Sequence, residues 1–225
     1  MSDHEATRGK IQRSDAVLMA MATCRRGTLF EPVRIQKLLF LIDREIPEAV
    51  DGPHFRFRPY RYGPFDPAVF RELDSLGRSG HVAVATGANH RAWSLTRSGL
   101  ERGTASLARL QVEVRDYLRE LARWVLALSF GRLLAAVYHR YPETATESVA
   151  LDVVRRFPIH AARVPQRPVL DGLAGVFDLS GLLTERPQQP TRIRSVSEAL
   201  YDDWAAVGDE LRAVMADFAT GHDGS

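Results

Sequence analysis

The sequence predicts a mainly α-helical protein that carries one small β-hairpin. Three observations support this fold class. Over most of the chain, apolar residues recur every three or four positions, as they do on the buried face of a helix. Two short segments of alternating apolar and polar residues, 81–85 and 91–95, flank the turn-forming residues 86–89. With 225 residues and an apolar content of 45%, the chain can build a full hydrophobic core.

The first two helices are expected at residues 14–24 and 32–46. Ser14 can cap the first helix, and Pro32 suits the first position of the second. In the second helix the apolar residues follow the i, i+3, i+4, i+7 pattern, and Pro47 ends it. This pattern leaves four polar positions on the helix: Arg34, Gln36, Lys37 and Arg44.

Residues 54–78 are predicted to form a short strand, a fixed turn and a third helix. Gly63 can adopt a positive φ, and Pro64 keeps Gly63 out of the helical region, so the chain must turn here. Asp66 suits the N-cap of the helix, and Pro67 suits its first position. The helix start is therefore supported by several independent signals.

The elements of residues 14–105 follow one another in a familiar order. Two helices, a strand and a third helix precede the hairpin, and Thr96 can cap a closing helix. This is the order of a winged helix-turn-helix, a common DNA-binding fold. We therefore predict a winged helix-turn-helix domain at 14–105 and a helical module at 106–225.

The helical module contains two apolar seams, at 107–128 and 196–218, in which apolar residues step by three and four. Such a seam packs against another helix, in the same chain or in a second copy. We expect the two seams to pair two copies in a homodimer. Between them, the capping-box spacing of Thr144 and Glu147 predicts a helix that runs to about residue 156. Residues 157–192 hold five prolines and three glycines and are predicted to be irregular.

Two short motifs suggest a family. Gln36-Lys37-Leu38-Leu39-Phe40 is followed by Tyr62-Gly63-Pro64-Phe65. In this order they resemble the motifs of Panacea proteins, which are phage-associated and carry the SocA-like antitoxin domain, and of their winged-helix relatives. Residues 57–61 differ from the acidic residue and Trp that precede Tyr-Gly-Pro in Panacea members, which indicates a relative of that group. The resemblance implies a regulator associated with a phage or mobile element, or an antitoxin-like protein.

Charge is distributed unevenly along the chain. The net charge is +2, but residues 1–110 carry 17 basic and 12 acidic side chains, whereas residues 111–225 carry 13 and 16. A basic front half and an acidic back half suit a binding module joined to an assembly module. An alternative is chance combined with a coding bias toward arginine, because Lys10 and Lys37 are the only lysines.

The sequence contains no motif that predicts catalysis. It lacks a Gly-rich phosphate loop, a nucleophile elbow and a pair of zinc ligands at helical spacing. Cys24 is the single cysteine, which excludes an intrachain disulfide and a cysteine-based metal cluster. We therefore predict a protein that is not an enzyme and has no cofactor or metal. It has neither a membrane-spanning apolar segment nor a signal-peptide core, which predicts a cytoplasmic location.

Binding of double-stranded DNA is the function that we predict. Helix 66–78 would be the recognition helix, although Asp66, Glu72 and Asp74 on it would repel phosphate. The expected contacts are phosphate contacts from Arg25, Arg26, Arg34 and Lys37, recognition-helix contacts from Arg71, Ser75 and Arg78, and wing-tip contacts from His90 and Arg91.

The alternative is an antitoxin-like adaptor that uses the winged helix to bind a protein, for example a toxin. Many winged helices bind proteins, and the acidic residues on helix 66–78 favour this alternative. In that case four residues of the 60–65 turn would contact the partner: Tyr60, Arg61, Tyr62 and Phe65.

Overall fold

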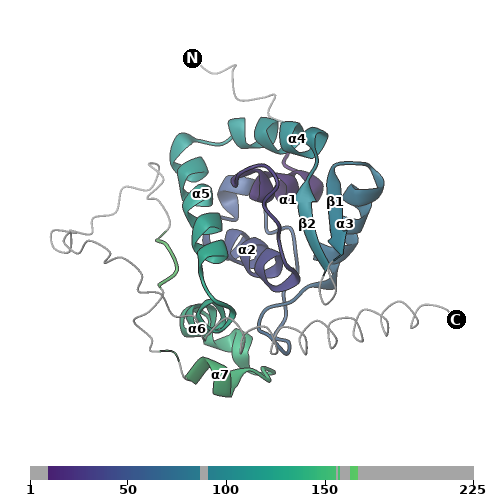
Figure 1. The fold of residues 1–225 in the computed structure, drawn as a ribbon. Coiled ribbons are helices and arrows are strands. Elements are labelled where there is room, and N and C mark those ends of the chain that lie inside the picture. Colours follow the sequence, from purple (N-terminus) through teal and green to yellow (C-terminus); the bar gives the residue numbers. More distant parts are fainter. Residues whose placement is uncertain (1–9, 87–90, 156, 158–162, 167–225) are drawn as a thin grey trace, which may run out of the picture. The chain divides into compact units, whose positions relative to one another are not determined.

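The computed structural model describes residues 10–86, 91–155, 157 and 163–166 (Figure 1). It confirms a mainly helical protein with one small sheet of two antiparallel strands. The described residues up to 85 and from 92 to 166 belong to one compact unit. None of the helices in the described part of the chain has the length and apolarity to cross a membrane. The elements are α1 (Arg13–Ala22), α2 (Pro32–Glu45), α3 (Pro67–Arg78), β1 (Val82–Thr86), β2 (Arg91–Leu95), α4 (Arg97–Ala108), α5 (Val112–Ala127), α6 (Phe130–Arg140) and α7 (Leu151–Arg155), with 3-10 turns at Glu48–Val50 and Pro142–Ala145.

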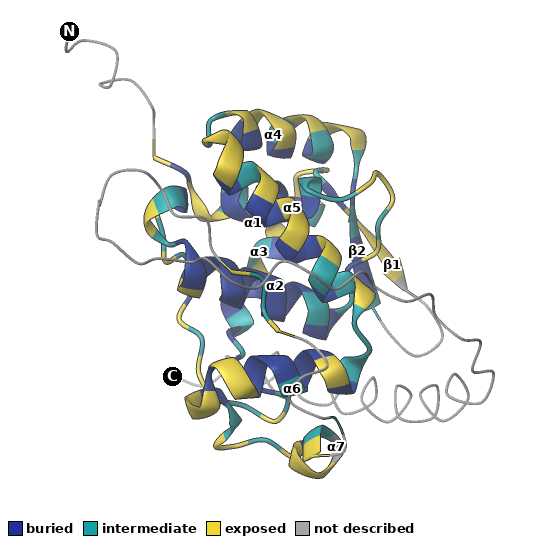
Figure 2. Cartoon of the chain, turned by 90° about the vertical axis from the view of Figure 1, so that its left-hand side faces the viewer, coloured by how far each residue is buried: buried dark blue, intermediate teal, exposed yellow. Residues whose placement is uncertain are grey.

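Helix α2 is the centre of the core (Figure 2). All of its 14 residues except Arg34 and Arg44 are buried. Helices α1 and α5 pack against it. The ring of Phe40 meets the rings of Phe57 and Tyr141 edge-on, with centroids 5.4 and 5.0 Å apart. The helix is therefore covered on its polar side as well as on the apolar face that the sequence predicts.

Helix α3 begins as the sequence predicts. Asp66 is its N-cap, and the Oδ1 atom accepts a hydrogen bond of 2.8 Å from the N–H of Ala68. Pro67 is the first helical residue, and Gly63 has a φ of +84° in the turn before it. The inner face of α3 buries Phe70, Leu73 and Leu76.

The small sheet joins α3 to the core. The N–H of His81 donates to the carbonyl of Leu76, which fixes the end of α3 beside the start of β1. Trp93 of β2 stacks on Phe70, with ring centroids 5.3 Å apart. Trp93 also forms an isolated antiparallel bridge with Phe30, which lies just before α2. Three segments that are far apart in the sequence therefore meet at one buried tryptophan.

The strand predicted at residues 54–60 is wrong. This segment forms only an isolated bridge between Arg58 and Phe65. Three successive backbone N–H groups, of residues 54–56, donate instead to the carboxylates of Asp43 and Asp66. Because these donors are already satisfied by side chains, the segment does not need a neighbouring strand.

The apolar seam at 107–128 is split between two helices, because α4 ends at Ala108 and α5 begins at Val112. Helix α5 packs on α2 and α1, and it buries Val114, Leu118 and Leu121 inside the chain. The expectation that this seam pairs two copies is therefore wrong. The second seam, at 196–218, lies outside the described residues.

Two predicted caps are also wrong. The N-cap of α1 is Gln12, and Ser14 lies within the helix. Thr144 does not start a helix, because its Oγ1 donates to the carbonyl of Tyr141 inside a 3-10 turn. The next helix, α7, begins only at Leu151. Of the segment 157–192, only residues 157 and 163–166 are described.

Candidate nucleic-acid interface

The outer face of α3 presents a polar stripe to solvent. Arg71, Ser75 and Arg78 are exposed, and their spacing of four and three places them on one side of the helix. The opposite side is anchored in the core by Phe70 and Leu73. Two guanidinium groups and a hydroxyl are therefore held on a helix whose position is fixed by packing.

One of the three acids predicted to oppose phosphate binding is removed from the surface. Asp66 is only 7% exposed. Its Oδ2 accepts a hydrogen bond of 2.6 Å from the N–H of Arg56, and its Oδ1 caps α3. Glu72 and Asp74 are half-buried on the flanks of the helix. The stripe is therefore more basic than the sequence of α3 alone indicates.

The predicted phosphate contacts divide into two groups. Arg25 and Arg26 are exposed in the turn that follows α1, where they can meet a phosphate. Arg34 is not available, because its side chain is only 17% exposed and binds other groups of the chain. Its Nε donates to Glu31 at 2.8 Å, and its Nη1 donates to the carbonyls of Val125 and Leu126. Arg34 therefore closes the end of α5, and its assignment to DNA was wrong.

Lys37 is also wrongly assigned to DNA, because it is 2% exposed. Its Nζ donates to the carbonyl of Pro64 at 3.0 Å. Burial lowers the pKa of Lys37 to about 7. The side chain therefore fastens the turn at Pro64 to α2 from inside the protein.

The predicted wing is described in part. His90 lies outside the described residues. Arg91 is the first residue of β2 and is half-buried. On β1, Ala83, Val84 and Ala85 are exposed. The described part of the hairpin therefore exposes a small apolar face at residues 83–85.

The 60–65 turn, predicted for the alternative partner, is held by contacts within the chain. The rings of Tyr60 and Phe65 lie 5.1 Å apart, and Tyr62 meets Phe130 of α6 at 5.6 Å. The side chain of Arg61 is exposed, while its carbonyl accepts a hydrogen bond from the N–H of Val149. The three aromatic rings are half-buried, so each keeps some surface for a partner.

The first motif, 36–40, binds the second motif, 62–65, and the residue that follows it. Gln36 donates to the carbonyl of Asp66 at 2.9 Å and accepts from its N–H at 3.1 Å. Lys37 holds the neighbouring Pro64. A Cβ on Gly63 would lie 2.7 Å from the ring of Tyr138, which packs over the turn from α6. The two motifs therefore form one contact region, in which α2, the turn at Gly63 and α6 meet. Tyr138 was missed because nothing in the local sequence links residue 63 to residue 138.

The buried acids of α2 hold the same region together. Burial raises the pKa of Asp43, which accepts the N–H groups of His54 and Phe55. Glu45 accepts from the Tyr141 hydroxyl and, at 3.3 Å, from Arg140. These carboxylates accept hydrogen bonds from groups of the protein itself. They therefore hold α2 against the segment at residues 54–55 and against the end of α6. Among the described residues no group of three or more ligating side chains could hold a metal ion.

No protein-family model, curated protein or solved structure matches the chain. The candidate interface therefore rests on its own geometry. That geometry is an exposed basic stripe on α3, with Arg25 and Arg26 as further exposed cations. Such an arrangement can bind a polyanion.

Proposed function

We propose that the protein is a non-enzymatic, DNA-binding transcriptional regulator with a winged helix-turn-helix. The main observation in support of the proposal is the exposed stripe on α3, formed by Arg71, Ser75 and Arg78. The order of α1, α2, α3, hairpin and α4 agrees with a winged helix-turn-helix, in which the helix before the hairpin reads DNA. The motif resemblance favours a system associated with a phage or mobile element.

The proposed mechanism places α3 in the major groove of a duplex. Arginine can donate two hydrogen bonds to the O6 and N7 of guanine, and serine can bond to several bases. Arg71 and Arg78 would supply the first kind of contact and Ser75 the second. Arg25 and Arg26 would neutralise phosphates and thereby set the position of the protein on the duplex.

Fluorescence anisotropy tests the proposal. The purified protein is titrated into a labelled duplex from the region upstream of its own gene, and into a scrambled duplex, at several salt concentrations. If Arg25 and Arg26 each neutralise a phosphate, the slope of log K against log salt is about −2. The Arg71→Ala/Arg78→Ala variant should bind the upstream duplex much more weakly and should lose most of its preference for that duplex over the scrambled one, because these two arginines are proposed to contact bases.

The control variant is Arg119→Ala/Arg132→Ala, which changes the net charge equally at exposed positions on α5 and α6. It should bind the duplex almost like the wild type. If neither duplex is bound even at low salt, or if both double variants lose affinity equally, the proposal fails.

A second candidate function is an antitoxin-like adaptor. Val149 is 62% exposed, and its N–H bonds to the carbonyl of Arg61 beside the half-buried Tyr62. Exposed aliphatic surface next to aromatic rings suits a protein partner. A pull-down with the product of a neighbouring gene tests this function. Binding that survives Arg71→Ala/Arg78→Ala but is lost in Val149→Asp would support the adaptor.

A further inference from the structure

The connection between α2 and α3 carries a basic segment at residues 52–65. This segment contains three arginines and no acidic residue. In a helix-turn-helix the two helices are commonly joined by about three or four residues, whereas here α2 ends at Glu45 and α3 begins at Pro67. Long connections without helix or strand are uncommon in compact domains and are often functional. The 52–65 segment therefore supplies cations that a short turn would lack.

Two of these arginines, Arg56 and Arg58, point away from the core. The neighbouring Phe55 is buried, and the ring of Phe57 packs edge-on against Phe40 of α2 at a centroid distance of 5.4 Å. Because side chains alternate along an extended chain, the two arginines face the opposite way, and both are exposed. Neither guanidinium binds another of the residues that the structure describes. Both charges are therefore available to a partner, at positions about 7 Å apart along the backbone.

The backbone of this segment is fixed to the start of α3. The N–H of Arg56 donates to the carboxylate of Asp66, the N-cap of α3, at 2.6 Å. Arg58 exchanges backbone hydrogen bonds of 3.0 and 2.9 Å with Phe65. Asp66 precedes Arg71 by five residues, which is a rise of about 7.5 Å along the helix. Since the major groove is about 12 Å wide, an α3 helix in the groove would bring the segment close to the phosphates at its edge.

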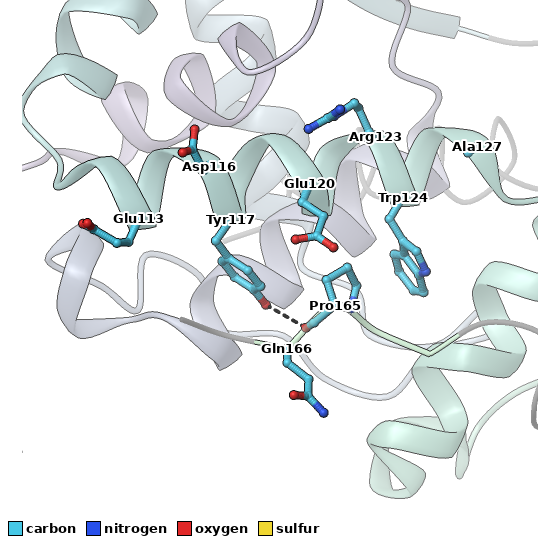
Figure 3. Close-up of a pocket in the computed structure, with 9 residues that line it drawn as sticks. All are labelled: Glu113, Asp116, Tyr117, Glu120, Arg123, Trp124, Ala127, Pro165 and Gln166. Atoms are coloured by element: carbon cyan, nitrogen blue, oxygen red, sulfur yellow. Dashed lines mark hydrogen bonds between the residues drawn. The ribbon is translucent and has the colours of Figure 1, made fainter. Parts of the chain in front are cut away.

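The surface along α5 has the opposite charge. A pocket of about 730 Å³ lies there (Figure 3), and its lining includes the carboxylates of Glu113, Asp116 and Glu120. Figure 3 shows Glu120 turned toward the side of Pro165, whereas Arg123 points away from it. Carboxylates repel phosphate, so a polyanion is repelled along α5 and attracted at the 52–65 segment.

We propose that Arg56 and Arg58 bind two backbone phosphates of the duplex, at the edge of the major groove that receives the N-terminal end of α3. The inference rests on the proposed DNA binding by α3 and adds a second contact surface to it. Phosphate contacts set the position of a protein on DNA, whereas base contacts supply sequence preference. The segment therefore contributes affinity and position, and Arg71 and Arg78 contribute the preference.

The salt dependence of binding tests this inference. Anisotropy titrations with the upstream and the scrambled duplex are made between 50 and 200 mM salt. Arg25 and Arg26 alone would give a slope of about −2, and two further phosphate contacts make it about −4. This fourfold rise in salt should then weaken binding by the wild type about 250-fold. For Arg56→Ala/Arg58→Ala we expect a slope of about −2 and a weakening of only about 16-fold.

The two pairs of arginines should also differ in their effect on sequence preference. Arg56→Ala/Arg58→Ala should weaken binding to both duplexes by the same factor, because phosphates are common to every sequence. Arg71→Ala/Arg78→Ala should instead lose the preference for the upstream duplex.

Three controls separate a phosphate contact from a structural role. Arg56→Lys/Arg58→Lys keeps both charges and should keep a slope near −4. Arg119→Ala/Arg132→Ala removes the same charge elsewhere on the surface and should also keep that slope. Circular dichroism melts establish that each variant is folded.

The possible failures of the inference and of the proposed function can be distinguished. If the wild type binds neither duplex, both fail. If the wild type binds the upstream duplex and folded Arg56→Ala/Arg58→Ala keeps the wild-type slope, only the inference fails. It also fails if the wild type binds a single strand of the upstream sequence more tightly than the duplex, because the aromatic rings of the segment would then be stacking on bases.

Discussion

At the scale of single residues, the unusual feature is a lysine inside the core. Lys37 has one hydrogen-bond acceptor, the carbonyl of Pro64, and burial lowers its pKa to about 7. An unfolded lysine has a pKa of about 10.4. Between these two pH values the unfolded chain binds more protons than the folded one, so the free energy of unfolding rises with pH. Below pH 7 both states are protonated, and the full cost of burying the ammonium group is present.

Replacement of this lysine should therefore change the pH dependence of stability. At pH 6, we expect Lys37→Met to unfold with a free energy about 1–3 kcal/mol higher than the wild type. The advantage should fall by about 2 kcal/mol between pH 7 and pH 9, as the wild-type lysine loses its proton. Urea denaturation of the wild type and the variant at pH 6, 7 and 9 measures the difference in their free energies of unfolding. Lys10→Met, at an exposed lysine, is the control. A difference that does not vary with pH would contradict the account.

Asp66 provides a second prediction at this scale. Its carboxylate accepts the N–H of Ala68 and the N–H of Arg56, so Asp66→Ala removes a cap and leaves a second donor without its partner. We expect a loss of about 2–4 kcal/mol in the free energy of unfolding. Removal of a side-chain cap alone costs about 1 kcal/mol. A loss of no more than about 1 kcal/mol in urea denaturation of Asp66→Ala would therefore show that the Arg56 contact contributes nothing.

At the scale of elements, the turn at Gly63 connects three helices. It follows the 3-10 turn after α2, leads into α3 and is covered by Tyr138 of α6. Burial raises the pKa of Tyr138 to about 12, and its hydroxyl lies 2.7 Å from that of Ser148. The positive φ of Gly63 and the contact with Tyr138 are two separate reasons for glycine at this position.

These two reasons can be separated by comparing glycines. Gly27 has a φ of +81°, close to the +84° of Gly63, but no atom lies within 4 Å of the Cβ position of Gly27. Gly27→Ala should therefore cost only the backbone strain, about 1–2 kcal/mol. Gly63→Ala should cost a further 1–3 kcal/mol or so, because the methyl group overlaps the Tyr138 ring. Thermal denaturation compares the two variants. Losses that agree within about 0.5 kcal/mol would mean that the ring moves aside freely.

At the scale of the whole molecule, features that depend on neighbouring residues were predictable from the sequence. Features that depend on contacts between distant segments were not. The cap at Asp66 and the turn at Gly63 depend on neighbouring residues, and both were predicted. The burial of Arg34 depends on α5, about 90 residues away. In the same way, the burial of Lys37 involves the turn at Pro64, 27 residues later in the sequence, whose carbonyl accepts a hydrogen bond from Nζ. Since periodicity describes one helix at a time, it assigned both cations to the surface.

The same distinction applies to the candidate interface. Arg71, Ser75 and Arg78 were predicted correctly to lie on the exposed face of their helix, because the apolar residues between them fix that face. The inward position of Asp66 follows from its contact with Arg56, ten residues earlier in the sequence. The seam at 107–128 was assigned to a second copy because its period does not specify which helix covers it.

Site-specific photocross-linking tests the central claim, that the outer face of α3 binds duplex DNA. The cross-linking residue p-benzoylphenylalanine replaces Ser75 on α3 or, as a control, Thr104 on the exposed side of α4. Each protein is irradiated with the labelled duplex from upstream of its own gene. We expect a covalent protein–DNA product from position 75 and none from position 104. The account would be contradicted if position 75 gave no product, or if both positions gave equal amounts.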